Sequence, residues 1–203
     1  DHIAGLQQLL KRFDIPVYTK QGTWREIQDK LIVPKNRLIE LTKGSLTLGS
    51  LIVEPFSVSH DAADPIGINV FAGNDKATIV TDTGVISDDI LRRIDDTTLL
   101  VLEANYDPHM LRFGPYQPFL KQRVASDEGH LSNEMAAQAL LMMKRPDFMQ
   151  VILAHRSENN NNSVLVTQTI GKMLVDGGVR IGPEMKLQHG QPNEIVSIQS
   201  VKR

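Results

Sequence analysis

The stretch Phe56-Ser-Val-Ser-His-Asp-Ala-Ala-Asp-Pro65 marks the point where an apolar strand ends in titratable side chains. Residues 51–58 are mostly apolar or β-branched, which predicts a strand. His60, Asp61 and Asp64 follow it, and the closing proline lacks the amide hydrogen that a further ladder bond needs. Such residues at one strand end are usually ordinary loop or turn residues. The pattern gains weight because it recurs three more times.

Three later apolar runs also end in potential metal ligands. Residues 76–81 stop at Asp82, residues 98–102 stop at Glu103, and residues 148–154 stop at His155. In layered α/β folds the carboxyl ends of strands are where side chains project into a crevice. Imidazoles and carboxylates without thiols suit a Zn²⁺ or Mn²⁺ site that activates water. The alternative for any single position is an isolated polar strand end.

Composition limits the class of protein. The 203 residues suit one domain, and the net charge of −2 gives no overall basic field for a polyanion. There is no cysteine, which excludes disulfides and thiolate metal sites and leads us to expect a reducing cytoplasm. No apolar run reaches the length of a membrane span, so we expect no membrane partner. The sequence predicts no particular oligomeric state.

Helical patterns alternate with the strands, which predicts a layered α/β fold. We expect helices over 3–13, from a capping box at Thr23 to about 30, over 87–94, from 132 or 133 to 143, and over 164–175, with two short helical pieces in 107–126. Expected strands are 15–19, a pair formed by 37–41 and 45–48, a hairpin formed by 67–72 and 76–84, and weak strands near 179–188 and 194–200.

Asp1-His2 stands directly before a helical pattern, and from this start we expect the sequence to be part of a longer protein. The order Asp1-His2, His60, Asp82, His130, His155 resembles the metallo-β-lactamase family, whose hallmark is His-x-His-x-Asp-His, then a later His, a bridging Asp and a final His.

Within that family, several blocks resemble the WalJ/YycJ branch, described as DNA exonucleases that degrade from a 5′ end. Two departures are the absent His-x-His pair and Tyr106, which stands where many relatives carry histidine. The blocks are Ser59-His-Asp-Ala-Ala-Asp-Pro65, Leu102-Glu-Ala-Asn105, Leu120-Lys-Gln-Arg123, Gly129-His-Leu-Ser-Asn133 and Leu153-Ala-His-Arg-Ser-Glu-Asn-Asn160.

The resemblance implies an αββα sandwich, with residues 1–203 forming a single domain that lacks its first strands and the His-x-His half of the metal motif. It also implies two divalent metal ions, Zn or Mn. Asp1, His2 and His155 would hold one ion, His60 the other, and Asp82 would bridge them. Because only His60 and Asp82 would then hold the second ion, we expect residues 1–203 alone to bind it weakly and to be poorly active.

The resemblance further implies phosphodiester hydrolysis by a water activated between the two ions. His130, at a helix N-terminus, would bind a phosphate or protonate the leaving oxygen, unless it simply caps its helix. Glu103 and Asn105 would orient metal ligands. The other residues expected at the substrate or the reacting atoms are Asp1, Ser132, Lys121, Arg123 and Arg156; for the three cations the alternative is a solvated surface charge.

Three functions remain open from the sequence. The first is a 5′-to-3′ DNA exonuclease that contacts the phosphate backbone and the 5′ end. The second is a hydrolase of the same fold acting on RNA, a small ester or a thioester. The third is a non-enzymatic protein with a structural metal. Residues 159–162, four asparagines, are expected to form a polar loop and a helix cap, where one amide can support the site.

Overall fold

A computed structural model describes residues 2–42, 44–191 and 194–198. The chain forms two compact units, which we describe separately: Asp1–Gly44 with Ala62–Pro65, and Ser45–Asp61 with Ile66–Arg203. The expectation of a single domain stays a prediction.

The smaller unit differs from the expectation in two ways. Its helix α2 (Gln21–Ile27) begins after Lys20, not at a capping box on Thr23. The Thr23 hydroxyl instead donates to the Asp64 carbonyl oxygen at 3.3 Å, and the Lys20 ammonium lies 3.1 Å from the Asp64 carboxylate. The predicted pairing of 37–41 with 45–48 is also wrong, because β2 pairs in parallel with β1. The other elements are α1 (Leu6–Arg12), β1 (Val17–Thr19), η1 (Lys35–Arg37) and β2 (Leu38–Glu40).

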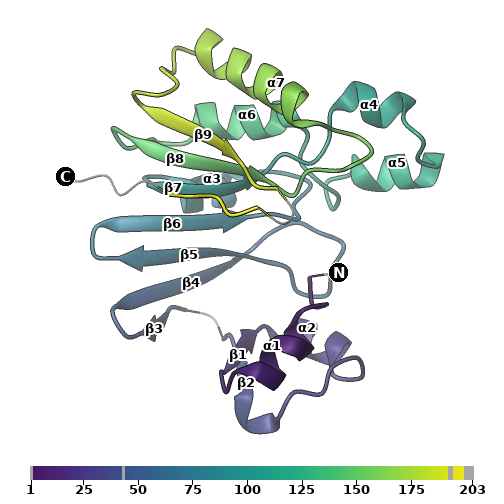
Figure 1. Ribbon diagram of the computed structural model, residues 1–203, viewed down its shortest axis with the longest axis vertical. Helices are drawn as coiled ribbons and strands as arrows, with labels where there is room; N and C mark the ends of the chain where they lie inside the picture. Colours follow the sequence, from purple (N-terminus) through teal and green to yellow (C-terminus); the bar gives the residue numbers. More distant parts are fainter. Residues whose placement is uncertain (1, 43, 192–193, 199–203) are drawn as a thin grey trace. The chain divides into compact units, whose positions relative to one another are not determined.

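The larger unit contains a seven-stranded sheet in the order β3-β4-β5-β6-β7-β8-β9 (Figure 1). The pairs from β3 to β6 are antiparallel, and those from β6 to β9 are parallel. The predicted hairpin is therefore confirmed as β5 and β6. The strands are β3 (Leu46–Leu48), β4 (Leu51–Ser57), β5 (Ile66–Ala72), β6 (Asp75–Val80), β7 (Leu99–Glu103), β8 (Met149–Ala154) and β9 (Met185–His189).

This topology brings four strand ends to one edge of the sheet. Strand β4 lies two antiparallel steps from β6, so both run in the same direction, and β7 and β8 run parallel to β6. The carboxyl ends of β4, β6, β7 and β8 therefore lie at the same edge. The residues that end these strands or closely follow them are His60, Asp82, Glu103 and His155.

The helices of the larger unit begin where the sequence places capping side chains. Ser87, Asp107, Ser132 and Asn162 each accept a hydrogen bond from an amide three residues later. Gly114-Pro115 separates two short helices, as predicted. The helices are α3 (Asp88–Ile94), α4 (Pro108–Phe113), α5 (Pro118–Val124), α6 (Asn133–Met142) and α7 (Ser163–Asp176).

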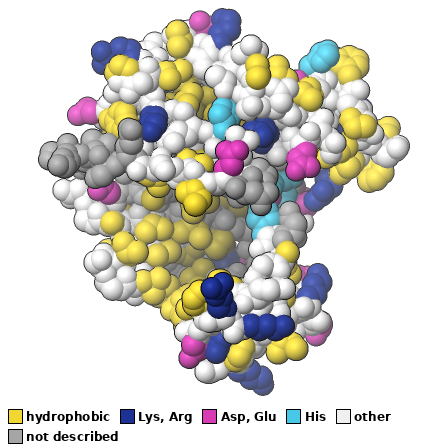
Figure 2. Space-filling view, in the orientation of Figure 1, with side chains coloured by type: hydrophobic (Ala, Val, Ile, Leu, Met, Phe, Trp, Pro, Cys, Tyr) yellow, Lys and Arg dark blue, Asp and Glu magenta, His cyan; other side chains and the backbone are white. Residues whose placement is uncertain are grey.

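The main core lies between one face of the sheet and the helices α3, α6 and α7. Leu100 and Leu102 on β7 are fully buried and belong to one cluster with Ile94, Leu140 and Ile170 from these helices. The α/β class is thus confirmed, and of the αββα arrangement the described residues contain one large sheet with helices packed on one face. Figure 2 shows hydrophobic side chains gathered over the strands of the sheet on the viewed face.

Two further expectations concern the end of the chain and membranes. Strand β9 confirms part of the predicted strand at 179–188, whereas residues 194–198 are not in a strand and 199–200 lie outside the described residues. In the described part of the chain, no helix has the length and apolar character required to cross a membrane.

Candidate metal centre

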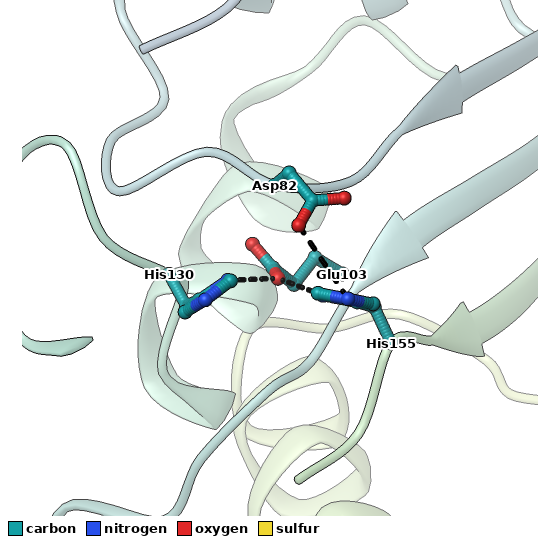
Figure 3. Close-up of side chains that lie close together, drawn as sticks. All are labelled: Asp82, Glu103, His130 and His155. Carbon is teal, nitrogen blue, oxygen red and sulfur yellow. Dashed lines mark hydrogen bonds and ion pairs between the residues drawn. The ribbon is translucent and has the colours of Figure 1, made fainter. Parts of the chain in front are cut away.

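The carboxyl edge of the sheet brings together His60, Asp82, Glu103, His130 and His155. Figure 3 shows Asp82, Glu103, His130 and His155 pointing toward one another from different strands and loops. One potential ligand atom from each of these four lies within 4.8 Å of the others. Asp82 and His155 have φ angles of 54° and 52°, a conformation uncommon outside glycine and often found at functional sites. The chain thus turns sharply after β6 and β8.

Glu103 forms hydrogen bonds with two of the histidines. Its Oε1 accepts hydrogen bonds from the Nδ1 atoms of His130 and His155, at 2.8 and 2.7 Å. Its Oε2 accepts from the amides of Thr83 and Leu131, at 3.2 and 3.1 Å. Burial raises the pKa of Glu103, whereas the hydrogen bonds from the two histidines lower it. The lowering is the larger effect in total, so the pKa lies below its ordinary value. This buried, ionised carboxylate is saturated with donors and acts by orienting the two rings.

The Nε2 atoms of His60 and His155 lie close to acidic side chains, and the His60 Nε2 is 3.5 Å from the Asp61 carboxylate. The His60 Nδ1 donates to the Gly129 carbonyl oxygen at 3.0 Å, so in the neutral ring the Nε2 carries the lone pair. The Nε2 atoms of His60 and His155 lie 3.7 and 3.4 Å from the same Oδ1 of Asp82. Ligands about 2 Å from a tetrahedral ion lie about 3.3 Å apart, so these three side chains would suit a divalent metal.

Hydrogen bonds position both the ring and the backbone of His155. The hydrogen bond to Glu103 raises the pKa of His155, and burial acts in the opposite direction. The Asn105 side-chain amide donates to the His155 carbonyl oxygen at 2.7 Å. Asn105 thereby fixes the backbone of the loop after β8, and its side chain supports the site through the main chain.

Asn161 provides a buried link that the sequence only partly indicated. Its Nδ2 lies 3.1 Å from the carbonyl oxygens of Ala104 and Asn105, directly after Glu103. The same side chain exchanges hydrogen bonds with Asn133, which begins α6, at 2.9 and 3.1 Å. One amide of the asparagine run therefore joins the strand end of β7 to α6, while Asn162 caps α7.

Replacement of Asn161 by alanine is expected to destabilise the protein. Asn161 is 4% exposed, and its loss leaves several buried polar groups without a partner. We expect the free energy of unfolding to fall by about 2–4 kcal/mol. Urea unfolding monitored by circular dichroism measures this change. Asn159→Ala, an exposed neighbour, is the control and should stay within about 0.5 kcal/mol of the parent; equal values for the two variants would contradict the prediction.

The residues expected at the substrate lie in different environments. Arg123 pairs with both oxygens of Asp61, the residue after His60, and this bond lowers the pKa of Asp61. The Lys121 ammonium donates to the Arg112 carbonyl oxygen at 2.8 Å. Ser132 is buried, and its hydroxyl caps α6. These contacts give the three residues structural roles, and their contact with substrate stays a prediction.

A cavity of about 320 Å³ adjoins the cluster. His130 and His155 form one part of its wall, and Arg156 lies beside them. The Arg156 Nη1 is buried without a hydrogen-bond partner among the described residues. The volume is near the lower end of ordinary ligand pockets. The other lining residues are Asn105, Tyr116, Leu120, Arg123, Val124, Ser157, Glu158 and Asn159.

Two of the expected metal ligands are not placed at this cluster. Asp1 lies outside the described residues. His2 belongs to the smaller unit, which is described separately from the unit that carries the other ligands. The ligand roles of Asp1 and His2, and the catalytic role of Asp1, therefore stay predictions.

The sequence that carries this cluster matches a known protein family. The family model described as beta-lactamase superfamily domain matches residues 1–155, which include every residue of the cluster. The chain belongs to the beta-lactamase superfamily. This beta-lactamase superfamily chain is 34% identical over 203 residues to "Exodeoxyribonuclease YycJ" of Bacillus anthracis, covering 99% of this chain and 77% of that protein.

A second relative supports the same branch of the superfamily. "Exodeoxyribonuclease WalJ" of Streptococcus pneumoniae is 30% identical over 198 residues, which cover 95% of this chain and 73% of the relative. The crystal structure of the metallo-beta-lactamase fold protein YhfI from Bacillus subtilis has a TM-score of 0.65 at 16% identity, over 92% of this chain and 70% of that one. The predicted WalJ/YycJ-like assignment and the metallo-β-lactamase fold are thus confirmed.

Superfamily membership and the ligand cluster together support the use of divalent metal ions. Sequence reasoning from the residues missed Gly129, whose carbonyl fixes the His60 ring. A Cβ atom at Gly129 would lie 2.2 Å from the Arg123 carbonyl oxygen, so only glycine allows this loop to pack. The sequence shows a glycine before His130, but it does not show that the backbone of Arg123 packs against this glycine.

Proposed function

We propose that this protein is a metal-dependent exodeoxyribonuclease that degrades DNA from a 5′ end. The observation that carries the proposal is the pair of imidazole Nε2 atoms, from His60 and His155, that face one oxygen of Asp82 beside a cavity with an arginine. The names of the two relatives support DNA as the substrate class. His60, Asp82 and His155 would help to hold two ions, zinc or manganese, in the proposed centre.

Bound divalent cations supply Lewis acidity, which lowers the pKa of water and offsets charge on phosphoryl oxygens. The chain's own residues then position the reacting groups. Glu103 holds His130 through Nδ1, which leaves the His130 Nε2 to carry a proton toward the leaving oxygen. Arg156, in the wall of the cavity, is suited to hold a phosphate oxygen.

The test uses the full-length chain and a DNA duplex in which one strand carries a 5′ phosphate and a 3′ fluorophore. With Mn²⁺ present, we expect this strand to shorten stepwise from its 5′ end. The His60→Ala and Asp82→Ala variants remove proposed ligands, so their rates should fall by more than the roughly 10–100-fold that outer-shell changes cost. Denaturing electrophoresis over time measures both.

Three results would overturn all or part of the proposal. Cleavage of RNA or of a thioester, with the DNA left intact, would assign another hydrolase activity to the same fold. Stoichiometric metal binding without turnover of any of these substrates would indicate a structural ion. Initiation inside the strand, or from the 3′ end, would refute the 5′-end assignment.

A further inference from the structure

The helices α4 and α5 form a hairpin with its own small core, residues 108–124. Tyr106, Leu111 and Val124 are buried together, with Tyr116 and Leu120 packed against them. The Lys121 ammonium, on α5, donates to the Arg112 carbonyl oxygen at the end of α4. The hairpin therefore has its own packed core and a hydrogen bond that joins its two helices.

Two large aromatic rings of this hairpin contribute nothing to that core. Phe113 is 68% exposed and Phe119 is 70% exposed. The His109 ring lies 4.6 Å from the Phe113 ring, and the Arg112 guanidinium lies 5.3 Å from its centroid. Figure 2 shows hydrophobic side chains at the surface over α4 and α5. The outer surface of the hairpin therefore presents aromatic rings flanked by groups that carry or can take positive charge.

The charge of the hairpin differs from that of the whole chain. Residues 108–124 contain Arg112, Lys121, Arg123 and His109 but no aspartate or glutamate, whereas the chain as a whole has a net charge of −2. A cationic segment with exposed aromatic rings is complementary to a polyanion with stackable bases. It is less suited to another protein surface, because no acidic group of the hairpin is available to pair with a partner's cations.

The hairpin also borders the proposed catalytic cavity. Tyr116, Leu120 and Arg123 line that cavity together with His130 and His155. Arg123 further joins α5 to Asp61, next to His60. A strand whose terminal nucleotide enters the cavity would therefore lie directly beside the hairpin.

We infer that the α4–α5 hairpin is a binding arm for single-stranded DNA, an inference that rests on the proposed function. Phe113 and Phe119 provide stacking surfaces for unpaired bases, and Arg112 contacts a backbone phosphate. The arm holds the part of the strand that follows the nucleotide in the cavity. Stacking recognises every base, so the arm adds affinity without sequence preference.

The test measures binding of 3′-fluorescein oligo(dT) of about twenty nucleotides to the full-length chain in EDTA, by fluorescence anisotropy. Base stacking on aromatic rings implies that Phe113→Ala and Phe119→Ala each raise Kd about fivefold or more, and the double variant more than about tenfold. Arg112→Ala should reduce the slope of log Kd against log salt concentration by about 0.7. Tryptophan at 113 or 119 should restore the affinity lost by alanine.

Matched controls come from other surfaces of the same unit. Met142→Ala removes an apolar side chain of α6 that is also 68% exposed, and Arg92→Ala removes an exposed arginine of α3. Neither should change Kd or the salt slope. In turnover assays the arm variants should raise KM for the single strand while kcat stays within about twofold, since the arm lies outside the reacting atoms.

Several outcomes would refute the proposal that the α4–α5 hairpin binds single-stranded DNA. One is an unchanged Kd in the double alanine variant. Another is full affinity with leucine at 113 and 119, because leucine keeps an apolar surface but has no ring to stack on a base. A change from dimer to monomer on sedimentation of the double variant would make a second copy of the chain the occupant. If any of these results occurs while DNA is degraded normally, the hairpin proposal fails and the proposed exonuclease function stands. If DNA binding depends on the hairpin but no DNA is degraded, only the proposed exonuclease function is refuted.

Discussion

Glu103→Gln is expected to lower exonuclease activity and metal affinity by at least about 10–100-fold, the range found when an outer-shell partner of a metal ligand is lost. Each carboxylate oxygen of Glu103 accepts two N–H groups, from His130 and His155 on one side and from Thr83 and Leu131 on the other. In either orientation the glutamine NH₂ group would therefore face two donors. A histidine can relieve this conflict only by moving its proton to Nε2, which removes the lone pair that a cation needs.

The same variant should also be less stable. Glu103 is fully buried, and unpaired buried donors cost about 1–3 kcal/mol each, so we expect the free energy of unfolding to fall by about 2–5 kcal/mol. Metal content by mass spectrometry, kcat and urea unfolding measure the three effects. Glu184→Gln, which changes a partly exposed glutamate paired with Arg180 far along the sequence from the cluster, is the control and should leave metal content and kcat unchanged. Full metal affinity in Glu103→Gln would refute the orienting role.

Asp82→Asn is expected to abolish metal-dependent stabilisation and to reduce activity by more than about 100-fold. Its Oδ1 is the atom that the Nε2 atoms of both His60 and His155 face, and the amide of asparagine lacks the charge that compensates a divalent cation. A ligand that binds only the folded state at one hundred times its Kd adds about 2.7 kcal/mol, or roughly 5–10 °C in Tm for a chain of this size. The parent should show this shift when Zn²⁺ or Mn²⁺ is added after chelation, and Asp82→Asn should not.

Asparagine is chosen at position 82 because the backbone there has a φ of 54°, which asparagine adopts more readily than alanine. Asp96→Asn is a closely matched control: Asp96 has a φ of 55°, is exposed, and pairs with Lys144 at 2.9 Å on the surface. Loss of such a surface pair costs at most about 1 kcal/mol. A metal-induced rise in Tm that is equal in parent and Asp82→Asn would exclude Asp82 as a ligand.

Most elements of the larger unit followed from local patterns in the sequence. Continuous apolar runs predicted β4, β6, β7 and β8, and capping residues such as Ser87 predicted where helices begin. Apart from the strand expected near 194–200, the errors involve the smaller unit, where a threonine in a capping-box spacing bonds to the distant Asp64. A capping pattern predicts a hydrogen bond between two nearby residues. A residue far along the chain can bond to one of them instead, and a short stretch of sequence does not contain that residue.

For the site, consecutive residues are enough to predict which chemical groups stand at the strand ends, because each apolar run changes directly to His60, Asp82, Glu103 or His155. The different roles of these groups become visible once the strands and loops are assembled. Glu103 is saturated by four N–H groups from three segments of the chain, and His60 is fixed by the carbonyl of Gly129, 69 residues away. Hydrogen-bond partners and burial depend on strand order and loop packing, so an orienting carboxylate and a metal ligand look alike until the strands are assembled.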